Sequence, residues 1–234
     1  MKTGIIATII GSAAAFTPSS TGRAPSAIRM EIEEETVVVA EPAAAAVASI
    51  NGWTADPSQP CYGLPGALAP LGFFDPLGFT KDADLNTVKR YREAEVMHGR
   101  VSMMAVIGYL VGESTPTITY GMDVHHTIAN NQLSEVPGTV LFPFFLAINI
   151  AEAWRASAGW VEPGMGPLFS LRENYYPGDI GFGSGFKPTD AKDFANLQTK
   201  ELQNGRLAML AAAGMCVQEQ VNGVGILENL GISL

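Results

Sequence analysis

The most constraining feature of this 234-residue sequence is a long apolar segment that carries three polar groups near its middle. Residues 93–110 read EAEVMHGRVSMMAVIGYL, in which Glu95, His98 and Arg100 precede ten apolar or small residues. Helical patterning extends over about residues 82–112, so the helix would be roughly 45 Å long at 1.5 Å per residue. That exceeds the roughly 30 Å of a bilayer's hydrocarbon core. We therefore predict a tilted membrane helix with its N-terminal end in water.

The same pattern occurs twice in the chain. EAEVMHGRVSMMA at 93–105 aligns without a gap with TKELQNGRLAMLA at 199–211, and a loop rich in Gly and Phe precedes each copy. Two copies of one helix indicate a pair of helices related by pseudo-twofold symmetry. The matched positions are Glu95 and Glu201, His98 and Asn204, Gly99 and Gly205, and Arg100 and Arg206.

The repeat offers each charge a partner. A lone charge at the centre of a spanning helix costs about 2.5–3.5 kcal/mol on insertion scales. Within each copy Glu and Arg lie five residues apart, about 140° out of register, so they face different directions on one helix. We therefore predict two ion pairs between crossed helices, Glu95 with Arg206 and Glu201 with Arg100. The glycine before each arginine would let the two backbones approach closely.

The polar residue between each Glu and Arg suggests a metal. Glu95 and His98 share one helix face because they are three residues apart, and so do Glu201 and Asn204. Oxygen ligands suit Mg²⁺, and imidazole is widely accepted by metals. One ligand per metal is too few for a bare ion. It is enough for a magnesium already held by the four nitrogens of a macrocycle.

Two further segments have helical character, at about residues 136–158 and 189–222. Pro143 in the first of them predicts a kink or an early turn of the helix. A hydropathy scan alone would identify one uncertain span, because charges interrupt the other helices. With the repeat, the expected fold is an all-α membrane protein with three transmembrane helices, the first and third long and crossed. The expected N-caps are Asp82 for the first helix and Thr189 or Asp190 for the last.

Composition agrees with a membrane protein. Hydrophobic residues make up 47% of the chain and charged residues 16%, against about 25% charged in ordinary soluble domains. The net charge of -9 argues against nucleic acid, since phosphate binding needs clustered Lys and Arg. Cys61 and Cys216 have no spacing for a disulfide framework or a metal site.

The N-terminus has the composition of a targeting sequence. Residues 1–30 combine a short apolar stretch with a segment rich in Ser, Thr and Arg, which predicts a bipartite signal and transit peptide. The simpler alternative is a plain secreted protein with a disordered N-terminus. Residues 31–60 are expected to form a mobile leader before the folded domain at 61–234.

Together these motifs resemble the light-harvesting chlorophyll-binding proteins. E-x-x-H-G-R and E-L-x-N-G-R-L-A-M are similar to the first and third membrane helices of that family, and FFDPLGF to the loop before the first. VQEQVNGVGILENL resembles the family's C-terminal amphipathic stretch, which implies a short amphipathic helix. The likeness covers roughly residues 72–234. It implies that chlorophyll magnesium is ligated by Glu95, His98, Glu201, Asn204, Gln218 and, in the AEAWR of the middle helix, by Glu152 beside Arg155.

Other residues narrow the branch of the family. Phe144 stands where relatives often have a ligand, so that pigment is lost or bound otherwise, and Ser233 replaces the C-terminal His of some relatives, which removes another ligand. AAAFTP resembles the cleavage site of plastids acquired from a red alga by secondary endosymbiosis, and YYPGDIGF resembles the red-algal-type branch. This likeness implies chlorophyll a, chlorophyll c and carotenoids of the fucoxanthin or diadinoxanthin type. It also implies the thylakoid membrane of a secondary plastid, with lipids, other antenna subunits and a photosystem core, I rather than II, as partners.

The expected function is therefore light capture and transfer of excitation energy to a photosystem, without enzymatic activity. One alternative is a photoprotective quencher of the same family. A haem-binding membrane redox protein would need a second histidine in a membrane helix, and only His98 is placed for this. A soluble helical-repeat scaffold would leave the buried charges and apolar faces unexplained.

Overall fold

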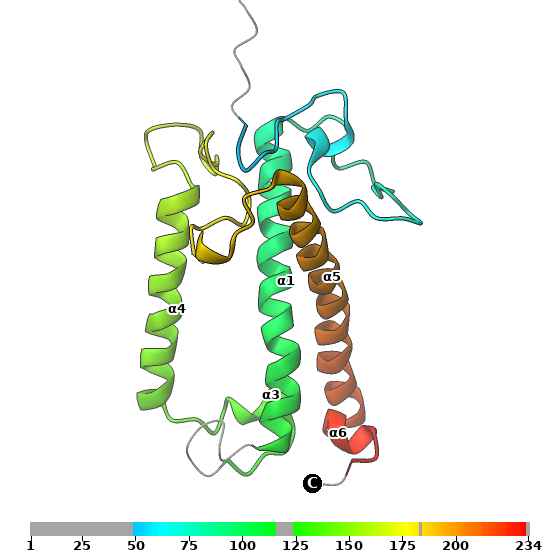
Figure 1. Ribbon diagram of the computed structural model, residues 1–234. Coiled ribbons are helices and arrows are strands. Elements are labelled where there is room, and N and C mark those ends of the chain that lie inside the picture. The colour runs from blue at the N-terminus through cyan, green and yellow to red at the C-terminus, as the bar shows by residue number, and fades with distance from the viewer. Residues whose placement is uncertain (1–48, 116–123, 183, 233–234) are drawn as a thin grey trace, which may run out of the picture. The chain divides into compact units, whose positions relative to one another are not determined.

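The computed structural model describes residues 49–115, 124–182 and 184–232, which form helices joined by long connectors (Figure 1). These residues contain no β-strand, only three isolated bridges. The predicted presequence at 1–30 lies outside them, as does Ser233. The helices are α1 (Leu85–Ser114), α3 (Ala129–Gln132), α4 (Gly138–Gly159), α5 (Ala191–Asn222) and α6 (Ile226–Asn229), with 3₁₀ helices at Pro60–Gly63 and Ser184–Phe186.

The ends of the two long helices are set by caps. Asp84, not the expected Asp82, is the N-cap of α1, because its side chain accepts a hydrogen bond from the Thr87 amide at 3.3 Å. Asp190 caps α5 through the Lys192 amide. Gly223 ends α5 with φ of 68°, a left-handed conformation that glycine adopts at little cost.

α1 and α5 pack against each other and come closest at two glycines. An ideal Cβ placed on Gly99 would lie 3.0 Å from the Cα of Gly205, and the reciprocal distance is also 3.0 Å. Any side chain there would force the backbones apart. Each glycine therefore contacts its own copy in the repeat, and the two helices are related about this point.

The symmetry extends to the far ends of both helices. Glu113 of α1 accepts hydrogen bonds from the backbone amides of Ile226 and Leu227 at 2.8 Å each, at the start of α6. Glu219 of α5, its counterpart in the repeat, accepts one from the Asn130 amide at 3.0 Å, at the start of α3. Each long helix thus holds a short helix by a buried carboxylate.

α4 is packed very differently. It continues through Pro143, which lies in its second turn, and Gly159 is its only buried residue. Phe142, Ile150 and Trp154 are each more than 60% exposed. By length and composition α4 is the one helix of the described residues that meets the criteria for crossing a membrane. The structure therefore presents a 22-residue apolar helix with almost no protein around it.

The predicted mobile leader is too long at its C-terminal end. Ile50 and Trp53 pack against a small core of Leu64, Val88 and Tyr176. The Trp53 and Tyr176 rings meet edge to face at 5.8 Å. Residues 31–48 lie outside the described chain, but from Ile50 onward the segment belongs to the folded protein. Its aromatic residues gain buried surface there, which a composition-based reading of the leader misses.

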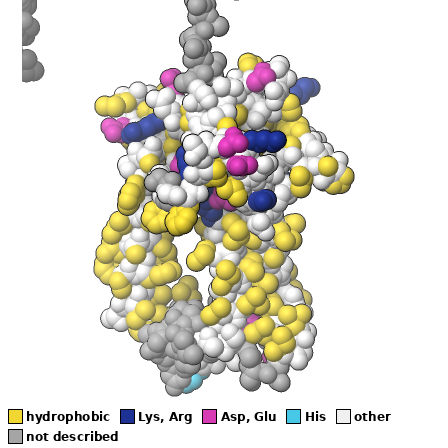
Figure 2. Space-filling model, in the orientation of Figure 1, with side chains coloured by type: hydrophobic (Ala, Val, Ile, Leu, Met, Phe, Trp, Pro, Cys, Tyr) yellow, Lys and Arg dark blue, Asp and Glu magenta, His cyan; other side chains and the backbone are white. Residues whose placement is uncertain are grey.

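Charged and apolar side chains separate along the helices. Figure 2 shows Lys, Arg, Asp and Glu gathered mainly at the end where α1 and α5 begin, with hydrophobic side chains over the rest of the long helices. The second half of α1 exposes Val101, Met104 and Ile107, and that of α5 exposes Leu210 and Val221. Exposed apolar area of this extent marks a surface that something other than water covers.

Candidate functional site

Two ion pairs join α1 and α5 beside the glycine contact. Arg100 Nε lies 2.7 Å from Glu201 Oε1. Arg206 lies 2.8 Å (Nε) and 2.7 Å (Nη2) from Glu95 Oε1. In both pairs the arginine of the other helix contacts only Oε1. The second oxygen of each glutamate is therefore not engaged by that arginine, although Glu95 Oε2 has Arg92 Nε at 3.6 Å.

His98 lies about one helical turn after Glu95, and Asn204 about one turn after Glu201. Each side chain contacts the backbone carbonyl four residues before it. The Nδ1 of His98 lies 2.7 Å from the Ala94 carbonyl oxygen, and the Nδ2 of Asn204 donates to the Lys200 carbonyl at 2.9 Å. Because a carbonyl can only accept, Nδ1 is the donor, and in the neutral ring Nε2 then keeps a lone pair. Both side chains are exposed. Each helix therefore orients one outward-facing metal donor, His98 Nε2 or Asn204 Oδ1, by a bond to its own backbone.

The donor set suits a metal that is already coordinated. Among the described stretches of the chain, no group of three or more His, Cys, Asp or Glu side chains lies close enough to hold a metal ion. Glu95, His98, Glu201 and Asn204 surround the helix crossing but present their donor atoms singly. This arrangement fits axial ligation of a magnesium macrocycle and does not fit a bare ion.

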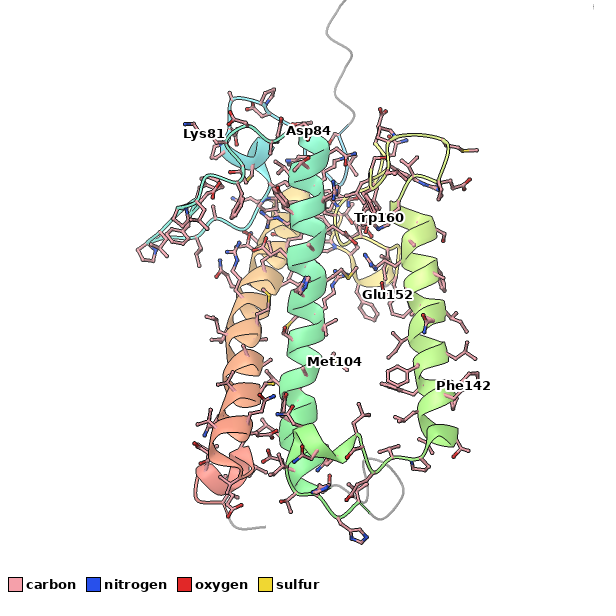
Figure 3. The ribbon with its side chains drawn as sticks, turned by 180° about the vertical axis from the view of Figure 1, so that it is seen from behind. Lys81, Asp84, Met104, Phe142, Glu152 and Trp160 are labelled. Carbon is pink, nitrogen blue, oxygen red and sulfur yellow. The ribbon has the colours of Figure 1, made fainter. Side chains whose placement is uncertain are left out.

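Glu152 lies on α4, away from the crossing. It is in the half of the helix nearer Trp160, while Phe142 lies at the opposite end (Figure 3). Its Oε2 accepts from Arg155 Nε at 2.9 Å and Nη2 at 2.7 Å. The same arginine donates through Nη1 to Glu93 Oε1 of α1 at 2.9 Å. Sequence reasoning missed Glu93.

Glu93 is one of the most buried polar residues of the described chain, 2% exposed. Its Oε2 accepts hydrogen bonds from the Tyr175 hydroxyl at 2.9 Å and the Gly178 amide at 2.6 Å. Burial, followed by the charge of Glu93, raises the pKa of Tyr175 above its ordinary value, so this hydroxyl stays protonated and keeps donating. The carboxylate is thus satisfied by α4 and by the connector after it.

Gln218 lies about four turns beyond Asn204 on α5. Its side chain is exposed and makes no hydrogen bond to any residue that the structure describes. The neighbouring Glu219 points inward and is buried. Gln218 is therefore placed to offer an amide oxygen outward, apart from the other candidate ligands.

Two hollows lie beside the ion pairs. One of about 800 Å³ is lined by Glu95, Arg206 and the first Gly/Phe loop, and one of about 380 Å³ by Glu201, Arg100 and the second loop. The side chain of Arg92 lines both, and its Nη1 is buried with no hydrogen-bond partner among the described residues. A buried donor without an acceptor is costly, which fits a site completed by a bound molecule carrying a carbonyl or ester oxygen. The exposed phenylalanines that line them are Phe73, Phe74, Phe79, Phe182 and Phe186.

Single outward-facing donors beside paired charges are the arrangement expected of a protein that holds metal-centred macrocycles. The chain belongs to the chlorophyll A-B binding protein family, whose model matches residues 60–220. This match confirms the family expected from the sequence.

Three relatives illustrate the similarity. The light-harvesting complex stress-related protein 3.2 of Chlamydomonas reinhardtii is 39% identical over 174 residues, which cover 72% of this chain and 67% of the relative. The fucoxanthin-chlorophyll a-c binding protein of Isochrysis galbana is 44% identical over 166 residues, 69% of this chain and 78% of the relative. The fucoxanthin-chlorophyll a-c binding protein D of Phaeodactylum tricornutum is 31% identical over 235 residues, 97% and 99% of the two chains.

Proposed function

We propose that this protein is a light-harvesting antenna of the plastid thylakoid membrane that binds chlorophyll a, chlorophyll c and carotenoids of the fucoxanthin or diadinoxanthin type. One observation carries the proposal. Two symmetry-related ion pairs each stand beside an outward-facing donor, His98 on α1 and Asn204 on α5. The names of the fucoxanthin-chlorophyll a-c binding relatives support the pigment types, and their chloroplastic location supports the compartment.

In the proposed arrangement α1, α4 and α5 all cross the membrane. The apolar composition of α4 supports this directly. For α1 and α5 the support is that the charges between Glu93 and Arg100, and those at Glu201 and Arg206, are paired within the protein, while the following turns are apolar and exposed. Paired charges are tolerated in a spanning helix, whereas isolated ones are expensive.

The proposed magnesium ligands are residues whose donor atoms face outward. Glu95 and Glu201 offer the oxygen that the opposite arginine does not engage, and His98 offers Nε2. Their charges are already balanced, so binding a neutral pigment leaves no carboxylate uncompensated. The complete proposed set is Glu95, His98, Glu152, Glu201, Asn204 and Gln218.

When bound, chlorophyll and carotenoid supply light absorption and excitation transfer, and the protein makes or breaks no bonds. The residues of the chain fix positions. Glu95–Arg206 and Glu201–Arg100 hold α1 and α5 at one crossing, and the bonds of His98 and Asn204 to their own helices fix the direction of each donor. The Gly/Phe loops would hold the ends of carotenoids at the two hollows. Fixed donors on a rigid frame keep pigment distances constant, which efficient transfer needs.

An absorption spectrum of the protein purified in mild detergent tests this function. A red chlorophyll a band with chlorophyll c and carotenoid absorption is expected to copurify in constant ratio to the protein. A colourless, folded preparation from pigmented membranes would contradict the antenna function.

The stress-related relatives support a second candidate, photoprotective quenching on the same scaffold. The two functions differ in the fate of excitation. An antenna is expected to keep a long chlorophyll fluorescence lifetime across the physiological pH range, whereas a quencher shortens it under inducing conditions. Time-resolved fluorescence of the purified protein separates them.

We further propose photosystem I as the partner core, on the likeness of YYPGDIGF to the red-algal-type branch. The family's association with photosystems supports a photosystem core as such. Sucrose-gradient fractionation of gently solubilised thylakoids tests the choice, because the protein is expected to sediment with photosystem I. Cosedimentation with photosystem II alone would reverse it.

A further inference from the structure

The carboxylate of Glu93 is buried, and three groups of the protein donate hydrogen bonds to it. Arg155 Nη1 donates to Oε1 at 2.9 Å, and the Tyr175 hydroxyl and Gly178 amide donate to Oε2 at 2.9 and 2.6 Å. A carboxylate with a charged donor on one oxygen and two neutral donors on the other has little freedom to rotate. Glu93 is therefore a fixed point of α1.

Arg155 connects Glu93 to Glu152. Its Nε and Nη2 both contact Glu152 Oε2, while its Nη1 contacts Glu93. Because the guanidinium is planar and rigid, its orientation toward one carboxylate determines its orientation toward the other. Glu152 Oε1 makes no hydrogen bond to any described residue, so its direction depends on Arg155.

No other side chain of α4 could take over this role. Among the described residues, Arg155 is the one α4 side chain that bonds to α1 or α5. The nearest packing contact involves the same cluster, because a Cβ on Gly159 would lie 2.8 Å from the Tyr175 ring. The direct side-chain connection between α4 and α1 therefore converges on Glu93.

The charges also differ from those at the helix crossing. Glu201 and Arg100 form a neutral pair, and Glu95 has two arginines beside it, Arg206 and, at 3.6 Å, Arg92. On α4 one arginine serves two carboxylates, Glu93 and Glu152, which leaves a formal charge of minus one. A molecule bound at Glu152 would lie beside that charge, and its electronic spectrum would respond to it.

We propose that Glu93 is a positioning residue for the pigment of α4: through Arg155 it fixes where the Glu152 carboxylate, and the chlorophyll magnesium bound to it, lies relative to α1. The inference rests on the proposed role of Glu152 as a magnesium ligand. It adds a residue that touches no pigment itself but sets the distance and tilt between the α4 pigment and those at the crossing.

The test compares Glu152→Leu and Glu93→Gln in the full chain assembled with its native pigments. Chlorophyll per protein is measured with low-temperature absorption and circular dichroism. Glu152→Leu, which leaves no oxygen donor at this position, is expected to lose one chlorophyll and so identify its band in the difference spectrum. Glu93→Gln is expected to shift or remove that same band and leave the others in place. A purely structural role would lower all bands together.

A matched control and a second variant keep the test decisive. Glu162→Gln makes the same charge change near the same end of α4, on an exposed side chain without contact to Glu93, and should leave the band unchanged. If Glu93→Gln does not assemble, Arg155→Lys replaces it, because one ammonium group keeps the charge but cannot orient two carboxylates. Arg155→Lys is expected to shift the same band.

The outcomes separate the two ideas. If Glu152→Leu loses one chlorophyll while Glu93→Gln and Arg155→Lys leave its band unmoved, the positioning role is wrong and the ligand role stands. If Glu152→Leu loses no chlorophyll, the ligand role of Glu152 is wrong, and the positioning role is overturned with it.

Discussion

The crossed helices α1 and α5 are held together by contacts within the protein, whereas α4 has few contacts with the rest of the described chain. At the crossing, two glycines meet at backbone distance and two ion pairs flank them. α4 has one anchored end, through Arg155 and Gly159, and exposed apolar side chains along the rest. The crossing is therefore fixed by the protein itself, and under the proposed function the position of α4 would depend on lipid and pigment.

Removal of pigment should expose this difference most strongly. Extracting pigment from the detergent-solubilised protein is expected to speed amide hydrogen exchange in α4 by at least about tenfold, while the crossing of α1 and α5 keeps more of its protection. Exchange followed by mass spectrometry gives both values in one experiment. Equal loss of protection in all three long helices would contradict the comparison.

Arg206→Leu should have the next largest effect, since it leaves Glu95 without its interhelix partner. Breaking a buried pair on one side costs about 3–5 kcal/mol. Because Arg206 and Glu95 are 38% and 27% exposed, the lower end is expected. Thermal unfolding followed by loss of chlorophyll circular dichroism measures it. Arg206→Lys, which keeps the charge, should lose less, and an equal loss would show that charge compensation is not what matters.

The glycine contact can be tested with internal controls. Gly99→Ala places a Cβ 3.0 Å from the backbone of Gly205, and the strain is expected to cost about 1–3 kcal/mol. Gly108→Ala has no atom within 4 Å of the new Cβ and should be neutral or stabilising by up to about 1 kcal/mol. Thermal unfolding of the two variants compares them directly. Similar midpoints would mean that the close approach does not limit stability.

His98→Leu is expected to remove one chlorophyll with only a modest loss of stability, because His98 is exposed and bonded only to its own helix. Pigment analysis per protein gives the number, and the thermal midpoint should fall less than in Arg206→Leu. His125→Leu, in an exposed connector, serves as the control and should keep every pigment.

The smallest effect concerns the connector that anchors α4. Partial burial alone would raise the pKa of Asp179, but hydrogen bonds from Lys187 and Asn51 outweigh it and lower that pKa. A lowered carboxyl pKa stabilises the fold above the unfolded-state value of about 3.9, and the stabilisation is lost as pH falls through the folded-state pKa.

Asp179→Asn should therefore lower the thermal midpoint slightly at neutral pH, with a constant difference from the parent protein down to about pH 5. Below about pH 4 the two proteins should converge. A difference that grows with acidification would contradict this sign.

The sequence predicts the crossed pair well because its determinants are local and occur twice. Glu, Gly and Arg at fixed spacing can satisfy one another in only one way when two copies meet. The N-cap of α1 was predicted two residues too early, at Asp82 instead of Asp84. Both residues have the same side chain, so only the backbone conformation distinguishes them. The length of the leader was overestimated because Trp53 packs against residues far along the chain.

Glu93 could not be found in the same way. In REAE it stands beside charged neighbours near a helix start, which normally indicates a face in water. Its partners Arg155, Tyr175 and Gly178 lie 62 to 85 residues away, and no spacing rule connects them. Glu113 and Glu219 did carry a signal, since extending the repeat beyond the arginines aligns the two acids. Recognising them needed the full length of the duplication.

The contact between Gly99 and Gly205 has a further consequence for how such a molecule can change. If the two helices came from two identical chains, every substitution in one helix would also appear in the other. A single chain that contains both halves is free of that constraint. It keeps the two glycines alike, yet places imidazole at His98 and an amide at Asn204 on equivalent backbone. In the proposed arrangement the two sides would bind chlorophyll with different ligand strength, and unequal site energies would give excitation a direction in which to flow.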